Sequence, residues 1–290
     1  MDRLLIPGSE WLYFKLYTGK KSADNLLQYI YPYLLSLKKD CIIRQFFFIR
    51  YSDPHFHLRL RLHLSENKDF SKILLSLYDL FKSAIEDGTL WNLQIDTYKR
   101  EIERYGITTM EFSEAIFCID SDAIIKLIKS LNHNERELHR WLLALLLIDD
   151  ILSASNCDIA HKKEVLMIIS QSFKHEFRFT THAYKKQLDT KYRNSKEMIF
   201  SVLDNRNNSP VQPYIHILNE RSYLMSLSIK QITEIEHDNA AITSLLKSFI
   251  HMTMNRLFRS HNRLHEMVLY DFLYRYYEST IARSRDGKLV

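Results

Sequence analysis

The chain has 290 residues, of which 46% are hydrophobic and 12% aromatic, a composition that excludes a disordered or fibrous protein and supports a large buried core. Its 40 Lys and Arg residues outnumber its 35 Asp and Glu residues only slightly, which excludes a polyelectrolyte role for the whole surface. Any basic site must therefore be local.

The N-terminal part of the chain predicts four strands and two helices in the order β-α-β-β-α-β. The aromatic segment 11–17 predicts the first strand, and apolar residues at helical spacing predict a helix over 22–37 with Ser22 as its N-cap. The remaining elements are a strand over 45–51, a turn over 52–55, a strand over 56–64, a helix over 69–85 and a strand over 90–98. This order is typical of a ferredoxin-like antiparallel sheet, in which right-handed crossovers place both helices on one face.

The strand predicted over 56–64 alternates apolar and basic residues without a break. Its side chains divide into an apolar row and a basic row, namely Phe56, Leu58, Leu60, Leu62 and Leu64 against His57, Arg59, Arg61 and His63. The apolar row must face the helices, so we expect the basic row on the opposite face of the sheet. Arginines two residues apart on a rigid strand suit a bound carboxylate. A solvated strand face, or internal ion pairs with Glu101 or Glu103, would give the same pattern.

The rest of the chain is mainly helical. Apolar periodicity predicts helices over 111–118, 121–131, 135–152, 161–175, 184–197, 228–237, 240–258 and 262–282, with a loop over 205–213. We predict an α+β fold with a sheet half over 1–106 and a helical half over 107–290, packed together as one domain. The helical half is expected to cover the basic face and to enclose a positively charged cleft.

A second basic segment, residues 98–106 (YKREIERYG), follows the last predicted strand. If that strand continues to about residue 100, Arg100 is in phase with Tyr98 and Asp96 and shares their face. A charged strand end that faces solvent is the alternative interpretation.

The helix predicted over 240–258 carries His251 and Asn255 one turn apart, beside an apolar stripe. This pair suits an oriented proton-transfer group, although a hydrogen-bonded histidine at the edge of a core has the same spacing. His261 and His265 are also one turn apart, but no Cys, Asp or Glu cluster at ligand spacing accompanies them, so we expect no metal site. The sequence contains no phosphate loop, GxGxxG or GxSxG motif.

Cysteine usage and the lack of long apolar runs indicate the compartment. Cys41, Cys118 and Cys157 are widely spaced and form no CxxC pair, as is typical of a reducing environment. The N-terminus has no signal-peptide pattern, and the longest aliphatic run, residues 141–148, is too short to cross a bilayer. We expect a cytoplasmic protein without a membrane span.

Five separated segments also resemble a known family. In chain order they are WLYFKLY (11–17), FFFIRYSDPHFHLRLR (46–61), YKREIERYG (98–106), EFSEAIFCIDSDAI (111–124) and HMTMNRLF (251–258). Together they resemble the C-terminal elimination domain of lantibiotic dehydratases, which also occurs as a separate chain in thiopeptide pathways. The resemblance covers residues from about 11 to 275.

The resemblance implies a lyase of bacteriocin biosynthesis that needs no cofactor. The family removes glutamate by β-elimination from glutamylated Ser or Thr of a ribosomally made precursor peptide, which leaves dehydroalanine or dehydrobutyrine. By motif matching, the glutamate-binding and catalytic arginines are Arg59, Arg61 and Arg100, and His251 is the leading acid/base group. His57 and Asn255 complete the expected substrate-binding set. The base that removes the peptide α-proton stays open.

The resemblance also implies partners. The chain lacks the large glutamylation domain of full-length dehydratases, so we expect a split system with a separate glutamyl-tRNA-dependent glutamylating protein and no direct contact with nucleic acid. A homodimer is compatible with family behaviour. Three alternatives remain: a pyridine-forming [4+2] cyclase of thiopeptide biosynthesis, an RNA-binding module with a basic sheet face, and a catalytically idle partner that delivers the peptide.

Overall fold

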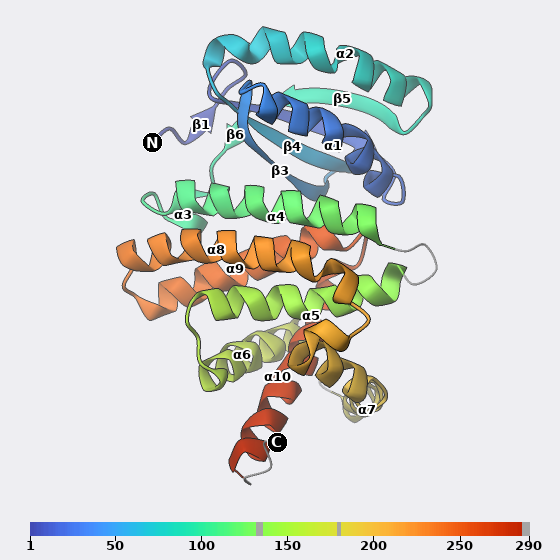
Figure 1. The fold of residues 1–290 in the computed structure, drawn as a ribbon, viewed down its shortest axis with the longest axis vertical. Helices are drawn as coiled ribbons and strands as arrows, with labels where there is room; N and C mark the ends of the chain where they lie inside the picture. Colours follow the sequence, from blue (N-terminus) through green and yellow to red (C-terminus); the bar gives the residue numbers. More distant parts are fainter. Residues whose placement is uncertain (132–135, 179–180, 286–290) are drawn as a thin grey trace. The chain divides into compact units, whose positions relative to one another are not determined.

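A computed structural model of the chain describes residues 1–131, 136–178 and 181–285 (Figure 1). The described residues form two compact units. Unit 1 comprises residues 1–130, 227–236 and 255–260, and unit 2 comprises the described residues within 131–226, 237–254 and 261–285.

Unit 1 is built on a four-stranded antiparallel sheet with the strand order β3-β4-β2-β5. The strands are β2 (Trp11–Thr18), β3 (Ile43–Ser52), β4 (Phe56–Leu64) and β5 (Leu90–Asp96). Helix α1 (Ala23–Lys39) connects β2 to β3, and α2 (Phe70–Glu86) connects β4 to β5. The four strands and two helices predicted from the sequence are confirmed, and the fold is α+β.

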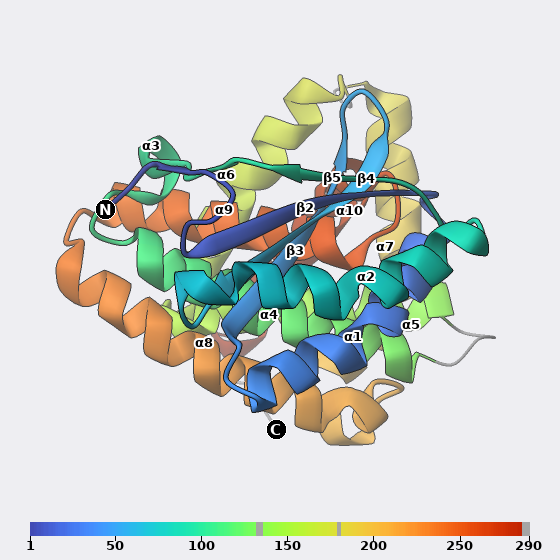
Figure 2. The same cartoon turned by 90° about the horizontal axis from the view of Figure 1, so that it is seen from above.

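Both connecting helices lie on the same side of the sheet (Figure 2). Phe14 lies directly opposite Leu60 in the β2–β4 ladder, and its ring centre is 5.4 Å from that of Phe81 on α2. Leu58, Leu60 and Leu62 are at most 1% exposed. The apolar row of β4 therefore faces the helices as predicted, and its basic row lies on the other face, which we call the arginine face.

The chain leaves the sheet earlier than predicted after β5. The Asp96 carboxylate accepts a hydrogen bond from the Thr97 backbone nitrogen at 2.7 Å, which turns the chain at the end of the strand. Tyr98–Lys99 then forms a separate strand, β6, that pairs with β1 (Leu4–Leu5). The predicted strand over 90–98 therefore ends at Asp96, and the condition that it continues to about residue 100 is not met, because this local turn competes with the ladder.

Other predicted boundaries also need correction. Helix α4 (Met110–Ser130) is one helix where two were predicted. The polar residues Asp120 and Ser121 do not interrupt it, because both are buried and hydrogen-bonded to other elements of unit 1. Helix α3 (Ile102–Tyr105) was not predicted. Ser22 occupies the N-cap of α1, but its side chain makes no capping hydrogen bond.

Unit 2 is helical. Its helices are α5 (Arg136–Ala154), α6 (Ile159–Glu176), α7 (His182–Asp204), α10 (Asn262–Arg285) and the first parts of α8 (Ile215–Ile235) and α9 (Asn239–Leu257). Helix α8 begins well before the predicted residue 228, and residue 135, the predicted start of α5, lies outside the described residues. The short 3-10 turns at 206–208 and 212–214 occupy the predicted loop.

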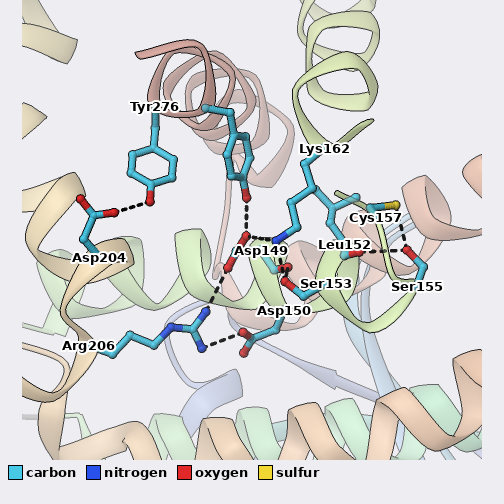
Figure 3. Close-up of polar contacts among 11 residues, drawn as sticks. Asp149, Asp150, Leu152, Ser153, Ser155, Cys157, Lys162, Asp204, Arg206 and Tyr276 are labelled. Atoms are coloured by element: carbon cyan, nitrogen blue, oxygen red, sulfur yellow. Dashed lines mark hydrogen bonds and ion pairs between the residues drawn. The ribbon is translucent and has the colours of Figure 1, made fainter. Parts of the chain in front are cut away.

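Charged groups join the helices of unit 2 around Asp149 near the end of α5 (Figure 3). Its carboxylate accepts hydrogen bonds from Lys162 of α6 at 2.7 Å, from Arg206 at 3.0 Å and from the hydroxyl of Tyr277 of α10. This cluster stands beside the apolar segment 142–148 of α5, whose side chains are fully buried. Within the described ranges, no helix is both long enough and apolar enough to cross a membrane.

Candidate active site

Arg61 is the central residue of the arginine face. It is only 7% exposed, and its guanidinium carbon lies 4.5 Å from the ring centres of Tyr13 and Tyr98 and 5.1 Å from that of Phe47. Among the described residues its Nε has no hydrogen-bond partner. Burial lowers the pKa of Arg61, so its charged form is held at a cost that the aromatic rings only partly offset. Binding of an anionic ligand would offset the cost of burying this charge, so Arg61 is a candidate anion-binding residue.

The expected internal partners of the basic row pair elsewhere. Glu101 lies 3.6 Å from Arg104, and Glu103 pairs with Arg3. Within the part of the chain that the structure describes, no carboxylate lies within ion-pair distance of Arg59 or Arg61. The interpretation of the basic row as an internal ion-pair network therefore fails for this pair of carboxylates.

Arg59 is positioned by its neighbours on the same face. Its guanidinium carbon lies 3.4 Å from the ring centre of Tyr51, and its Nε donates to His57 Nε2 at 3.3 Å. The other ring nitrogen of His57 lies 2.8 Å from the His55 carbonyl oxygen. These contacts require His57 to donate from Nδ1 and accept at Nε2, which is a neutral imidazole. Burial lowers the pKa of His57 and favours the same state.

Arg100 lies close to this group but its donors are already used by the protein. It is 3% exposed and binds the Glu114 carboxylate with Nε at 2.8 Å and Nη2 at 2.9 Å, while Glu10 accepts from Nη2 at 3.0 Å. Burial alone would lower the pKa of Arg100, but the hydrogen bonds and charge of Glu114 raise it overall. The Tyr98 hydroxyl donates to the same carboxylate at 2.9 Å. Arg100 and Glu114 thus hold the ring against which Arg61 lies.

Asn255 is likewise engaged within unit 1. Its side-chain oxygen accepts from the Arg50 backbone nitrogen at 2.9 Å, and its amide donates to the Arg50 carbonyl at 2.8 Å. The next residue, Arg256, donates from Nε to the Phe48 carbonyl at 2.8 Å and lies 2.9 Å from Asp120. These side chains satisfy the outer edge of β3, where no further strand pairs in the described sheet.

His251 belongs to unit 2 and has a carboxylate partner. Its Nδ1 lies 3.0 and 3.1 Å from the two oxygens of Glu266, a residue of α10 that is fully buried. The Tyr270 hydroxyl donates to Glu266 Oε2 at 3.0 Å. We assign the proton to His251 Nδ1, because the carboxylate can only accept when it is ionised. The assignment leaves the Nε2 lone pair available for proton transfer.

The family resemblance extends over most of the chain. A family model described as "Lantibiotic biosynthesis dehydratase C-term" matches residues 11–277. The chain belongs to the lantibiotic dehydratase C-terminal family.

One curated protein and two solved structures are similar to this chain. The subtilin biosynthesis protein SpaB of Bacillus subtilis is 23% identical over 276 residues, which are 92% of this chain and 25% of SpaB. The tRNA-dependent lantibiotic dehydratase MibB of Microbispora sp. 107891 has a TM-score of 0.71 at 20% identity and covers 96% of this chain and 29% of MibB. The pyridine synthase TbtD from thiomuracin biosynthesis has a TM-score of 0.58 at 12% identity, covering 93% of this chain and all of TbtD. The chain thus spans about a quarter of the length of SpaB.

Two features of this dehydratase C-terminal chain were not found from its sequence. Glu266 lies on the helix after His251, so no spacing rule connects the two residues. Tyr13 and Lys15 alternate with apolar residues in WLYFKLY, which was the available signal that they share the arginine face. Lys15 lies opposite Arg59 in the ladder and forms an ion pair with Asp96.

Proposed function

We propose that the chain eliminates glutamate from glutamylated Ser and Thr side chains of a ribosomally made precursor peptide. In this reaction the peptide α-proton passes to a base, the Cβ–O bond breaks, and glutamate leaves as a carboxylate while a Cα=Cβ double bond forms. The observation that carries the proposal is Arg61, a buried guanidinium without a carboxylate partner among the described residues of a dehydratase-family chain. Such a group stabilises the charge that develops on the leaving carboxylate.

The residues take different roles in this proposal. Arg61 and Arg59 bind the glutamyl group and stabilise the departing carboxylate. His251, oriented by Glu266, transfers a proton through Nε2. Arg100 and Asn255 hold Tyr98 and the edge of β3, respectively, so we assign them positioning roles.

The family relationship supports the wider setting. We propose that the peptide is glutamylated beforehand by a separate glutamyl-tRNA-dependent protein, in the cytoplasm, and that the chain can act as a homodimer. The name of MibB includes tRNA dependence, which supports a tRNA-dependent step before the elimination. We also propose that the sheet is ferredoxin-like, because its four strands are antiparallel in the order β3-β4-β2-β5 with helices after β2 and β4.

The alternative functions fit these observations less well. The likeness to TbtD supports a shared fold. A cycloaddition, however, joins dehydroalanines that have already formed and releases no glutamate, so it gives the buried guanidinium of Arg61 no carboxylate to bind. An RNA-binding sheet needs accessible aromatic rings, whereas Tyr13, Phe47 and Tyr98 are at most 4% exposed. A catalytically idle partner predicts no dependence on Arg61 or His251.

Mass spectrometry of a peptide that carries one glutamyl-serine ester tests the proposal. Incubation with the wild-type chain should remove glutamate and leave dehydroalanine, and Arg61→Met and His251→Ala should each slow this loss strongly. Arg44→Met, on the exposed start of β3, is the matched control and should retain wild-type activity. An intact ester, a hydrolysed ester that returns serine, or equal activity in all three variants would contradict the proposed function.

A further inference from the structure

Two buried polar atoms lie on neighbouring strands of the arginine face without partners. Tyr13 and Arg61 are directly opposite each other in the β2–β4 ladder and are 3% and 7% exposed. Neither the Tyr13 hydroxyl nor Arg61 Nε has a hydrogen-bond partner among the described residues. Leaving such a group buried and unpaired is unfavourable, because it loses its hydrogen bonds to water and gains none in return, so two of them on paired residues indicate a ligand.

We propose that the Tyr13 hydroxyl and Arg61 Nε–H together bind one carboxylate of glutamate, which makes Tyr13 a substrate-binding residue. This inference rests on the proposed function for the identity of the ligand. A carboxylate has two oxygens that can accept from two donors at once, and here one donor is charged and the other neutral. The guanidinium carbon of Arg61 lies 4.5 Å from the ring centre of Tyr13, so the guanidinium packs against the ring that carries the second donor.

The hydroxyls of Tyr17 and Tyr98, which lie beside this face, have protein partners. The Tyr17 hydroxyl donates to Gln94 at 3.1 Å, and the Tyr98 hydroxyl donates to Glu114 at 2.9 Å. Tyr13 is thus distinguished by its buried and unpaired hydroxyl. Burial raises the pKa of Tyr13, and the opposing charges of Arg61, Arg59 and Lys15 do not reverse that shift. The hydroxyl therefore stays protonated at neutral pH and can donate.

The aromatic surroundings make this donor pair selective. Phe47 and Tyr98 border the Arg61 guanidinium together with Tyr13 and exclude water from its faces. In such a site a neutral amide in place of the carboxylate loses the charge-assisted hydrogen bond. We therefore expect glutarate to bind and glutaramide, which has the same carbon chain with two amides, not to bind.

Calorimetric titration with glutarate and with L-glutamate tests the inference on the full chain. Tyr13→Phe should weaken binding of both ligands about 10- to 100-fold, because one hydrogen bond to a charged group is lost. Tyr17→Phe is the matched control, since it removes a hydroxyl on the same strand that already has a partner, and its affinity should stay within about twofold of wild type. Unfolding in urea should show that Tyr13→Phe is at least as stable as wild type, because no protein hydrogen bond is removed.

The outcomes separate this inference from the proposed function. Unchanged affinity in Tyr13→Phe, equal losses in Tyr17→Phe, equal binding of glutaramide, or no glutarate binding by wild type would overturn the inference, and ordered water would then account for the two unpaired atoms. Glutarate binding that depends on Tyr13, in a protein that leaves the glutamyl ester intact, would support the carboxylate site and contradict only the proposed reaction.

Discussion

His251 Nδ1 lies 3.0 Å from Oε1 of Glu266, and the hydroxyl of Tyr270 lies 3.0 Å from Oε2 of the same carboxylate. The carboxylate is fully buried and is held on both sides, so it can fix the orientation and the tautomer of the imidazole. Burial raises the pKa of Tyr270, which keeps that hydroxyl a donor at neutral pH.

Glu266→Gln should impair proton transfer without removing His251. The glutamine amide can donate to Nδ1, which allows the neutral ring to carry its proton on Nε2 instead. We expect the rate of glutamate elimination to fall about 10²- to 10³-fold, within the usual range for a general acid or base. Nitrogen-detected NMR of the histidine side chains should show the change of tautomer directly.

Tyr270→Phe is the matched control for this prediction. It removes one hydrogen bond from Glu266 but leaves the ionised carboxylate against His251, so the tautomer should be retained and the rate should fall less than in Glu266→Gln. A Glu266→Gln protein with wild-type tautomer and rate would show that Glu266 does not position His251.

Arg100 and Arg61 should differ sharply in their effect on stability. Arg100→Met leaves Glu114 buried without its bidentate partner and should lower the free energy of unfolding by about 3–5 kcal/mol. Arg61→Met removes a charge that has no carboxylate partner in the described chain, so we expect a change of about 1 kcal/mol or less. Urea unfolding of both variants measures the difference, and similar losses would contradict it.

The Arg100→Met penalty should also depend on pH. Burial already raises the pKa of Glu114 in the wild-type chain, and loss of Arg100 removes the interactions that oppose this shift. A carboxyl group with a raised pKa in the folded state destabilises the protein above the pKa of the unfolded state, and the penalty is relieved as the pH falls and the group is protonated. The gap between Arg100→Met and wild type should therefore narrow as the pH is lowered from neutral towards 4.5, the ordinary pKa of the carboxyl.

His57 should make the arginine face sensitive to acid. Its folded-state pKa is lowered from 6.5, chiefly by burial, and Arg59 Nε donates to its unprotonated Nε2. The unfolded chain therefore binds a proton more readily, so the His57 contribution is fully present above pH 6.5 and is lost as the pH falls below that value. Comparing urea midpoints of wild type and His57→Gln from pH 8 to pH 5 checks this prediction. The wild type should lose stability more steeply with acid, and parallel curves would contradict it.

Asn255 should stabilise the edge of β3 through its hydrogen bonds to the Arg50 backbone. Asn255→Ala removes two hydrogen bonds to the backbone of Arg50 and should cost about 1–3 kcal/mol of stability. Amide hydrogen exchange at Arg50 should speed up in this variant by a matching factor. Asn255→Asp keeps the acceptor for the Arg50 nitrogen but faces its carbonyl with a second acceptor, so it should be no more stable than Asn255→Ala. Unchanged exchange at Arg50 would contradict this positioning role.

The sequence was sufficient to predict features that depend on a short repeating pattern of residues. The strict alternation of residues 56–64 predicted which face of β4 carries the arginines, because side chains of a strand alternate regardless of the rest of the fold. It was not sufficient to predict hydrogen bonds and ion pairs between side chains of elements that are distant in the sequence. Three pairings depend on how the elements pack, and no local spacing in the sequence predicts them. They are Arg100 with Glu114, Asn255 with the Arg50 backbone, and His251 with Glu266. The turn at Thr97 was missed because a single side-chain hydrogen bond redirects the chain.

Asp149 and Asp150 are adjacent in the chain but should respond differently to neutralisation (Figure 3). Asp149 accepts from Lys162, Arg206 and Tyr277, so Asp149→Asn should lower the free energy of unfolding by about 2–4 kcal/mol. Asp150 pairs with Arg206 at 2.8 Å through one oxygen, and its other oxygen is buried without a hydrogen bond in the described chain.

Neutralising Asp150 should therefore be much less harmful. Burial raises the pKa of Asp150, so its charge is already costly near neutral pH, and Asp150→Asn should change stability by about 1 kcal/mol or less. Asp150→Asn should gain stability relative to wild type as the pH rises above 3.8, because burial raises the pKa of the wild-type carboxyl in the folded state and its ionisation there has a cost that the amide does not have. Equal losses in the two asparagine variants would mean that the cluster does not distinguish the two carboxylates.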